Sequence, residues 1–431
     1  MVFVLSKTKK PLMPCHPARA RELLKKGRAV VHKVYPFTIR LKDRVEGDVQ
    51  PIREKVDPGA KTTGIALESE GKRVLFFAEL NHKTTIHDNM RKRANYRGRR
   101  RSANLRYRAP RFNNRTRPNG WLPPSLQSRV DAITSWTVRF KKLCPVTDCS
   151  VETVRFDTQK LQNPEINGVE YQQGELFGYE VREYLLEKWG RKCAYCGKEN
   201  VPLEIEHIIP KSRGGTSRVS NLTLACYTCN EKKGNKTAAE FGYPEVQKKA
   251  KVPLKQAAIV NATRNALYRE LSKLFIKWVE VSTGGRTKYN RTRLGLPKTH
   301  YFDALCVGKS TPTQPGSFRN IDSTPVLSIT CKGKGQYRRT NVNKYGFPRL
   351  YLMRQKMVNG FQTGDMVKTV IPKGKYSGRY RGVLAVRKTG YFGLYRNKKL
   401  VAEGVKAPNT LLVQRFDGYT YSLQSPDSSP T

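Results

Sequence analysis

Acidic residues are scarce in this chain. Asp and Glu total 34 against 82 Lys and Arg in 431 residues, which gives a formal net charge of +48. A chain with this excess repels itself unless a polyanion neutralises it. The composition therefore predicts a nucleic-acid partner, although ribosomal proteins and histones share such a balance.

Long hydrophobic runs are also missing. No stretch of 18 apolar residues occurs, so we expect no membrane-spanning helix. The start, MVFVLSKTKKPLMP, lacks the apolar stretch and the small-residue cleavage site of a signal peptide. The length predicts about two to four domains.

The cysteines form no disulfide framework. Five of the nine have no framework spacing, namely Cys15, Cys144, Cys149, Cys306 and Cys331. This usage predicts a reducing, cytoplasmic setting.

The other four cysteines form two Cys-x-x-Cys pairs, which are Cys193/Cys196 and Cys226/Cys229. Four thiolates in this arrangement suit one tetrahedral, structural Zn²⁺. A Glu206–His207 pair lies between them, and a plain structural zinc ribbon has no use for such a pair.

The residues around this pair suggest hydrolytic chemistry. His207 can deprotonate a water molecule, and Glu206 and Asn230 can supply oxygen ligands to one Mg²⁺. With Asn221 between the pair and the second cysteine knuckle, the order resembles the HNH nuclease motif, a ββα-metal core here held by an added zinc. The alternative is a zinc-stapled binding module in which His207 and Asn230 only satisfy hydrogen bonds.

A second group of candidate catalytic residues is spread along the chain. Residues 52–80 read as a β-hairpin, and Asp57 follows its first apolar run. Glu152 lies near the middle of a predicted strand over residues 150–158, and Asp157, at the end of that strand, competes for the same role. Pro297 and Thr299 predict the start of a helix that carries His300 and Asp303 on one face. Three acids and a histidine in this order can bind two Mg²⁺ ions and hydrolyse a phosphodiester.

Residues 91–117 contain twelve Lys or Arg and no acid. Up to Pro110 this block can form one helix with positive charge all round, which cannot be stable without phosphates beside it. The alternative is a disordered basic tail. The predicted RNA contacts are Arg91, Arg93, Arg97, Arg99, Arg100, Arg101, Arg106, Arg108 and Arg111.

The remaining segments predict mainly helices and strands. Residues 2–5 suggest a strand, residues 11–14 a turn, and residues 18–27 a short helix. Further helices are expected at about 128–143, 179–190 and 253–275, and residues 276–285 read as a strand followed by a turn. After residue 310, β-branched and aromatic residues alternate with basic ones, which is typical of a small barrel or curled sheet.

Together these motifs resemble the IscB family of transposon-encoded, RNA-guided DNA nucleases, which are related to the CRISPR type II effectors. The matching motifs are PLMP, VDPGAKTTGIAL, the arginine-rich block, ETVRFDTQ, CxxC…EIEH…N…CxxCN and LPKTHYFDA. The resemblance runs from residue 1 to about 310. It implies that Asp57, Glu152, His300 and Asp303 form a RuvC-like site, that Glu206, His207 and Asn230 form the HNH site, and that Asn221 holds the loop that bears the histidine.

The resemblance also implies an α/β multidomain fold. It has an RNase H-like mixed sheet split by a bridge helix and by an inserted zinc-bound HNH domain, and a basic, β-rich C-terminal domain. The expected boundaries are 1–50 for the PLMP domain, 51–82, 118–178 and 251–310 for the RuvC-like segments, 83–117 for the bridge helix, 179–250 for HNH and 311–431 for the C-terminal domain.

The expected partners are a large guide RNA and target double-stranded DNA, bound by a monomer with no obligate protein partner and no membrane. The HNH site would cut the guide-paired strand and the RuvC-like site the other strand. Only about thirty residues separate the basic helix from the second RuvC-like segment, so the RNA itself must build much of the scaffold. Two alternatives stay open, a protein-only HNH homing or restriction nuclease and a nuclease-inactive RNA-binding regulator of a transposon.

Overall fold

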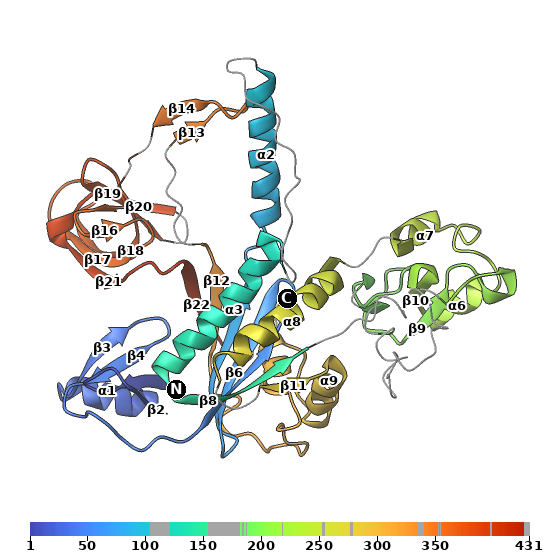
Figure 1. Cartoon of the computed structure of the whole chain (residues 1–431), viewed down its shortest axis with the longest axis horizontal. Coiled ribbons are helices and arrows are strands. Elements are labelled where there is room, and N and C mark those ends of the chain that lie inside the picture. The colour runs from blue at the N-terminus through green and yellow to red at the C-terminus, as the bar shows by residue number, and fades with distance from the viewer. Residues whose placement is uncertain are drawn as a thin grey trace.

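The computed structural model describes residues 1–103, 121–153, 182, 185–186, 188–217, 219–251, 255–275, 279–333, 340–351, 353, 355–396 and 399–425. Within these ranges the fold is a mixed α/β arrangement of several units around one large sheet (Figure 1). No helix in the described part of the chain has the length and apolar character needed to cross a membrane.

The N-terminal unit is a four-stranded sheet in the order β2-β1-β4-β3, with one helix beside it. Its elements are β1 Val2–Leu5, β2 Pro11–Cys15, α1 Pro17–Lys25, β3 Ala29–Lys33 and β4 Thr38–Leu41. The prediction of a turn at residues 11–14 is wrong, because these residues form edge strand β2 with Leu12 buried. Proline has no N–H group to donate. It is tolerated in an edge strand because only one side of that strand forms hydrogen bonds with the sheet. The helix ends before Gly27, whose φ of +68° suits glycine.

The large sheet has seven strands in the order β11-β8-β5-β6-β7-β12-β22. The strands are β5 Ile52–Asp57, β6 Thr62–Ser69, β7 Val74–Asn81, β8 Val146–Glu152, β11 Glu280–Ser282, β12 Val326–Cys331 and β22 Tyr419–Gln424. β5, β6 and β7 form an antiparallel meander, so the predicted hairpin is in fact three strands. β8 and β11 add in parallel beside β5.

Helices cover both faces of this sheet. α3 Pro124–Leu143 and α8 Lys255–Ser272 pack together on the face that holds Trp136 and Phe140. α10 His300–Leu305 lies on the other face, against Phe77, and α9 Gly284–Arg293 contacts it. The strand expected within residues 276–285 is confirmed by β11, but the turn expected after it is instead the start of α9, which Thr283 caps by accepting a hydrogen bond from the N–H of Arg286.

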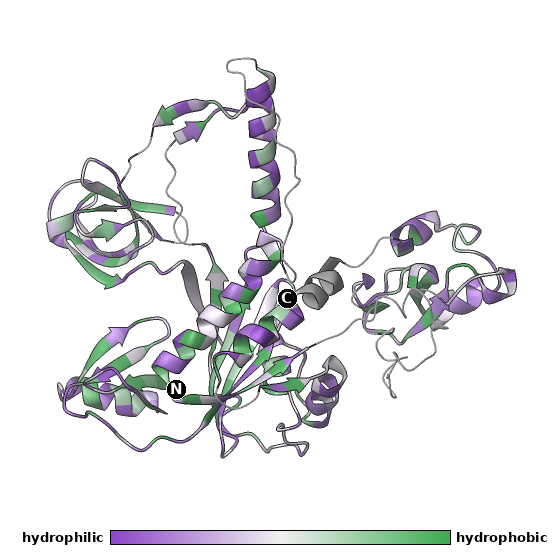
Figure 2. Cartoon of the chain, in the orientation of Figure 1, coloured by the Kyte–Doolittle hydropathy of each residue, from purple (hydrophilic) through white to green (hydrophobic). Residues whose placement is uncertain are grey.

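A long helix, α2 Ile86–Ser102, extends away from the sheet (Figure 1). It has no buried residue, and most of its residues are hydrophilic (Figure 2). The predicted extension of this helix to Pro110 falls partly on residues 104–110, outside the described residues. The helix also starts earlier than the basic block does.

The four-cysteine unit, which we define as described residues 185–251, forms a small separate core around Trp189, Ile208 and Leu224. Its elements are β9 Leu203–His207, β10 Leu222–Cys226, α6 Tyr227–Lys233, α7 Pro244–Lys251 and the 3-10 turns Lys211–Arg213 and Val219–Asn221. β9 and β10 are antiparallel and α6 follows directly. This is the ββα order that the sequence predicted. Half of the helix predicted at residues 179–190 lies outside the described residues.

The last region is β-rich, as predicted. A five-stranded sheet has the order β20-β19-β18-β17-β21 and encloses Phe392 and Leu394. Its strands are β17 Met366–Ile371, β18 Gly378–Ala385, β19 Tyr391–Arg396, β20 Lys399–Lys406 and β21 Thr410–Gln414, with a 3-10 turn at Ala407–Asn409. Two hairpins precede it, β13 Thr340–Val342 with β14 Pro348–Tyr351, and β15 Met357–Val358 with β16 Phe361–Gln362. Two strands of this region, β12 and β22, belong to the large sheet.

Candidate active sites

Two of the predicted acids end neighbouring parallel strands. Asp57 is the last residue of β5 and Glu152 is the last residue of β8. Val56 pairs with Val151, so Asp57 and Glu152, the next residue of each strand, lie side by side. The prediction that Glu152 lies mid-strand is wrong, because β8 runs from Val146 and ends at Glu152. Asp157, the competing candidate, lies outside the described residues.

The other two candidates come from α10, which lies on the same face. Thr299 caps this helix, and its hydroxyl accepts a hydrogen bond from the N–H of Phe302. His300 and Asp303 follow in the first turn, as predicted. The helix lies so close to β6 that a Cβ on Gly64 would be 1.8 Å from the carbonyl oxygen of His300. Position 64, which pairs with Asp57 in the neighbouring strand, therefore requires glycine.

These three carboxylates, Asp57, Glu152 and Asp303, form what we call the sheet cluster. Burial raises the pKa of Asp57 well above its usual range, and the charges of Glu152 and Asp303 raise it further. Burial likewise raises the pKa of Glu152 to about 7, against a hydrogen bond from Thr287 that lowers it. Burial raises the pKa of Asp303 although the Arg291 guanidinium lies 2.7 Å from its Oδ1. The three carboxylates could supply oxygen ligands to a divalent cation, whereas among the described residues only the four cysteines bring all their ligand atoms within 4.8 Å of one another.

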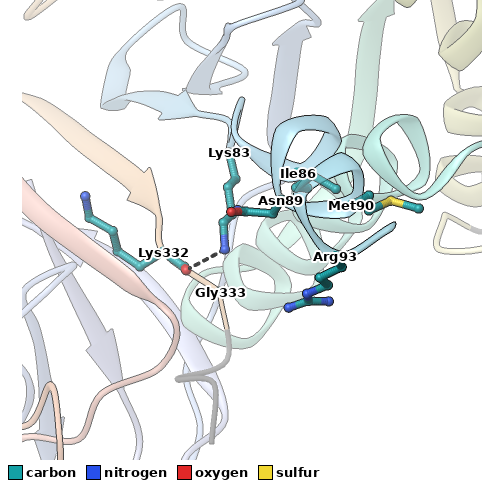
Figure 3. Close-up of a pocket in the computed structure, with 7 residues that line it drawn as sticks. All are labelled: Lys83, Ile86, Asn89, Met90, Arg93, Lys332 and Gly333. Carbon is teal, nitrogen blue, oxygen red and sulfur yellow. Dashed lines mark hydrogen bonds between the residues drawn. The ribbon is translucent and has the colours of Figure 1, made fainter. Parts of the chain in front are cut away.

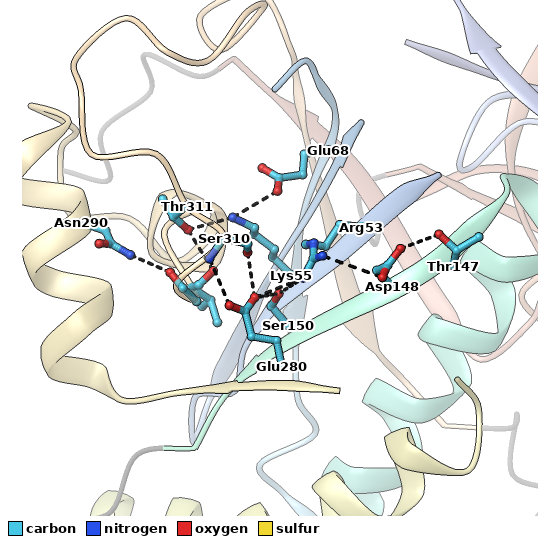
Figure 4. Close-up of polar contacts among 12 residues, drawn as sticks. Arg53, Lys55, Glu68, Thr147, Asp148, Ser150, Glu280, Asn290, Ser310 and Thr311 are labelled. Carbon is cyan, nitrogen blue, oxygen red and sulfur yellow. Dashed lines mark hydrogen bonds and ion pairs between the residues drawn. The ribbon is translucent and has the colours of Figure 1, made fainter. Parts of the chain in front are cut away.

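A buried polar network fixes α10 against the sheet (Figure 4). Lys55, two residues before Asp57, is fully buried and lies 3.2 Å from Glu68. Its Nζ also donates to the carbonyl of Leu305, at 3.0 Å, and to Thr311, at 2.8 Å. The C-terminal end of α10 is thus tied to the strand that ends in Asp57.

Further hydrogen bonds hold the segment after α10. Asn290 of α9 donates to the carbonyls of Cys306 and Gly308, both at 2.9 Å. Glu280 of β11 accepts hydrogen bonds from the N–H and the hydroxyl of Ser310, at 3.0 and 2.7 Å. The end of α10 and the segment after it are therefore held by contacts from two strands, β5 and β11, and one helix, α9 (Figure 4).

Sequence reasoning missed one acid on this face. Glu79 of β7 pairs with Gly64, which itself pairs with Asp57, so the three residues form one row across the sheet. Burial raises the pKa of Glu79, and the His300 side chain opposes this rise. The sequence signal that could have identified Glu79 is an acidic residue inside the apolar run VLFFAEL.

The four cysteines of the four-cysteine unit converge. The Sγ atoms of Cys193, Cys196, Cys226 and Cys229 all lie within 4.8 Å of one another. The Cys196 and Cys226 sulfurs are 3.7 Å apart, close to the roughly 3.8 Å that tetrahedral Zn–S bonds of about 2.3 Å imply. Burial would raise the pKa of the Cys193 thiol, but backbone hydrogen bonds at Cys196 and Cys226 lower it to about 7. The cluster is compatible with zinc.

His207 ends β9, and a structured loop follows it. Asn221 holds this loop, because its amide donates to the carbonyls of Ile209 and Thr216 and its Oδ1 accepts from the N–H of Ile209, all at 2.9 Å. Burial lowers the pKa of His207, and the charges of Lys211 and Lys233 lower it further. The imidazole is therefore neutral near pH 7 and able to accept a proton.

Glu206 and Asn230 are not brought together as a ligand pair. Glu206 is buried, and its two oxygens accept from Lys233 Nζ and from the Tyr195 hydroxyl, each at 2.6 Å. The Asn230 amide instead donates to Glu204 at 2.7 Å. Lys233 has no exposed side-chain surface and also donates to the carbonyl of His207, at 2.9 Å. In this arrangement Glu206 does not fit the predicted Mg²⁺ site, because an ammonium group takes the place of the cation.

The described candidate RNA contacts lie on α2, all of them exposed: Arg91, Arg93, Arg97, Arg99, Arg100 and Arg101. The guanidinium of Arg99 donates to the carbonyl of Lys344 at 2.7 Å, beside the β13–β14 hairpin. Asp88 is the one acid of the helix. The other three candidates, Arg106, Arg108 and Arg111, lie outside the described residues.

Comparison with known families gives two matches. The model described as HNH endonuclease matches residues 193–244, and the model described as RRXRR protein matches residues 2–174. No curated protein matches the chain.

Among solved structures, Streptococcus thermophilus Cas9 in complex with the GGAA PAM is similar over 61% of this chain and 32% of its own, at 14% identity and a TM-score of 0.23. The Type II-C Cas9 enzyme from Actinomyces naeslundii is similar over 60% of this chain and 59% of its own, at 13% identity and a TM-score of 0.22. This chain thus spans about a third of the first protein's length. Overlaps with TM-scores this low do not define its fold.

The HNH endonuclease match covers the four cysteines, His207, Asn221 and Asn230. Residues 193–244 therefore form a domain that matches the HNH endonuclease model. Nucleases of this kind are metal-dependent hydrolases of phosphodiesters.

Proposed function

We propose that this chain is an RNA-guided double-stranded DNA endonuclease of the IscB type. The HNH domain cuts the guide-paired strand. The sheet cluster, with His300, is a RuvC-like site that cuts the other strand.

The presence of two separate candidate sites supports this proposal. The HNH motif lies in the four-cysteine unit, whereas the sheet cluster lies on a different core, at the ends of β5 and β8. A protein-only HNH nuclease needs no second cluster of buried acids. Arg291 pairs with Asp303, yet burial still raises the pKa of all three carboxylates, and a structural role alone does not explain that cost.

At the sheet cluster, Asp57, Glu152 and Asp303 would hold divalent cations, which supply Lewis-acid stabilisation of the charge that develops on the phosphodiester. His300, exposed at the start of α10, is placed to accept the proton of an attacking water molecule. The Lys55 network keeps the helix that carries His300 and Asp303 fixed against Asp57.

In the HNH domain His207 acts as general base. Its lowered pKa keeps the ring neutral, and the Asn221 hydrogen bonds hold the loop that follows it. Lys233 fixes both the His207 carbonyl and Glu206. The four cysteines hold one Zn²⁺, whose role is structural.

α2 is the bridge helix of this proposal. Its exposed arginines have few acids beside them and no apolar core to pack against. The guide RNA supplies the phosphates that such a helix needs. Base pairing of the guide then selects the DNA sequence, and the protein binds the heteroduplex through its backbone.

The experiment is to purify the protein with and without its co-expressed upstream noncoding RNA and to sequence the RNA that co-purifies. The proposal predicts one discrete RNA and cleavage of a DNA duplex matched to its guide segment. Re-programming that segment should redirect cleavage. Equal cleavage of a fixed DNA site without RNA would indicate a protein-only nuclease, and RNA binding without any cleavage would indicate a regulator.

A further inference from the structure

A pocket of about 340 Å³ lies where α2 begins, between this helix and the end of β12 (Figure 3). One helix face supplies Ile86, Asn89, Met90 and Arg93, which are spaced three or four residues apart. Lys83, Lys332 and Gly333 line the rest. The candidate active sites share none of these residues.

The walls of this pocket are fixed by backbone contacts. The Lys83 ammonium donates to the carbonyl of Lys332 at 3.3 Å (Figure 3). The N–H groups of Lys332 and Gly333 donate to the carbonyl of Gly418 at 2.8 and 3.1 Å, next to β22. The pocket is therefore largely formed in the free protein, and a ligand need not build it.

The lining combines cations with an apolar surface. Lys83 and Arg93 contribute positive charges, Lys332 faces the pocket with its backbone while its side chain extends away from α2 (Figure 3), and no acid is among the lining residues. Met90 is 45% exposed although it is one of the few large apolar side chains of α2. Asn89 adds an amide that can both donate and accept hydrogen bonds.

This combination fits a nucleotide. A base has a flat apolar face and a hydrogen-bonding edge, and its backbone carries phosphates. The volume is near the low end of the roughly 300–1,000 Å³ of small-molecule sites, which suits one nucleotide and excludes a duplex. RNA is commonly recognised through such unstacked bases in single-stranded segments.

We propose that this pocket binds one unstacked nucleotide of a single-stranded segment of the guide RNA. The base lies against Ile86 and Met90, Asn89 contacts its edge, and Lys83 and Arg93 contact the adjoining phosphates. This inference rests on the proposed function, because that function supplies the RNA. The pocket would add a contact to the RNA base, beyond the contacts that the cationic side chains make with phosphates.

The test is the double variant Ile86→Ala/Met90→Ala, which removes apolar surface and no charge. We expect it to bind the co-purifying RNA on the order of 5–10-fold more weakly, from the loss of roughly 40–60 Å² of apolar contact. The dependence of binding on salt should not change. Alanine favours helix, so α2 should persist.

Arg91→Ala is the matched control, because Arg91 lies on α2 but is not among the pocket residues. Losing one phosphate contact there should flatten the slope of log K against log salt by about 0.7. If α2 binds RNA through charge alone, Arg91→Ala should weaken RNA binding and Ile86→Ala/Met90→Ala should not.

A second measurement does not depend on variants. RNA that carries 4-thiouridine in its single-stranded segments should crosslink to wild-type peptides that contain residues 83–93 or 332–333. Wild-type affinity in the double variant, or crosslinks confined to other peptides, would overturn the pocket assignment and leave the proposed function intact. A wild-type protein that binds no RNA would overturn both.

Discussion

Glu152→Gln should make the metal-free protein more stable at pH 8 while it abolishes cleavage by the RuvC-like site. Glu152 is 6% exposed at the end of β8, and its neighbours in the sheet cluster are also acids. Glutamine keeps the shape of the side chain and cannot ionise. The variant therefore separates the cost of burying the charge from its use in catalysis.

The magnitude follows from the pKa of Glu152. Its rise from 4.5 to about 7 corresponds to roughly 3 kcal/mol, at about 1.4 kcal/mol for each pH unit. The folded protein keeps this proton at pH values where the unfolded chain has lost it. The contribution of Glu152 to the wild-type free energy of unfolding is therefore greatest below about pH 4.5 and is lost as the pH rises through 7.

Hydrogen exchange of the β5 and β8 amides, corrected for intrinsic rates, is the assay. In EDTA, the wild type should lose roughly 3 kcal/mol of local protection between pH 5 and pH 8 through Glu152. Glu152→Gln should lack this part of the loss, and Mg²⁺ at pH 8 should restore protection mainly in the wild type. Wild-type protection that stays constant or increases with pH in EDTA would refute the reasoning.

Three other variants test separate parts of the molecule. Cys193→Ser should release zinc and unfold the HNH domain while the RuvC-like site still nicks, because so polar a unit has little core without its metal; a wild type with less than one zinc per chain would contradict this. Lys233→Met should leave Glu206 buried without a counter-ion, cost about 3–5 kcal/mol locally and abolish HNH cleavage; normal cleavage would show that Lys233 is dispensable. The triple variant Arg99→Ala, Arg100→Ala and Arg101→Ala should fold, yet bind the RNA more weakly and with a flatter salt dependence; wild-type affinity at ~150 mM salt with competitor RNA would contradict the role of α2.

Local signals predicted several elements well. The ββα order of the four-cysteine unit was predictable because its two Cys-x-x-Cys knuckles and the strands between them lie within about forty residues of the sequence. Thr299 was recognised as the start of a helix, and its hydroxyl does cap α10. Cap residues act on N–H groups two or three positions away, so sequence alone specifies them.

Features that depend on distant parts of the chain were not predictable. Residues 11–14 look like a turn, yet pairing with β1 makes them a strand. Lys233 stands in the run EKKGN among lysines that appear equivalent, and only the packing of α6 against β9 buries this one beside Glu206. Glu152 was predicted on the right strand, but the sheet places it at the strand end.

Strand-resolved cleavage tests the central claim, that one chain holds two independent nuclease sites. The RNA-loaded wild type, Asp57→Ala and His207→Ala should be compared on a guide-matched duplex labelled differently on each strand. We expect the wild type to cut both strands, Asp57→Ala to cut only the guide-paired strand and His207→Ala to cut only the other. If either single variant cuts neither strand while it still binds RNA and DNA, the two-site account is contradicted.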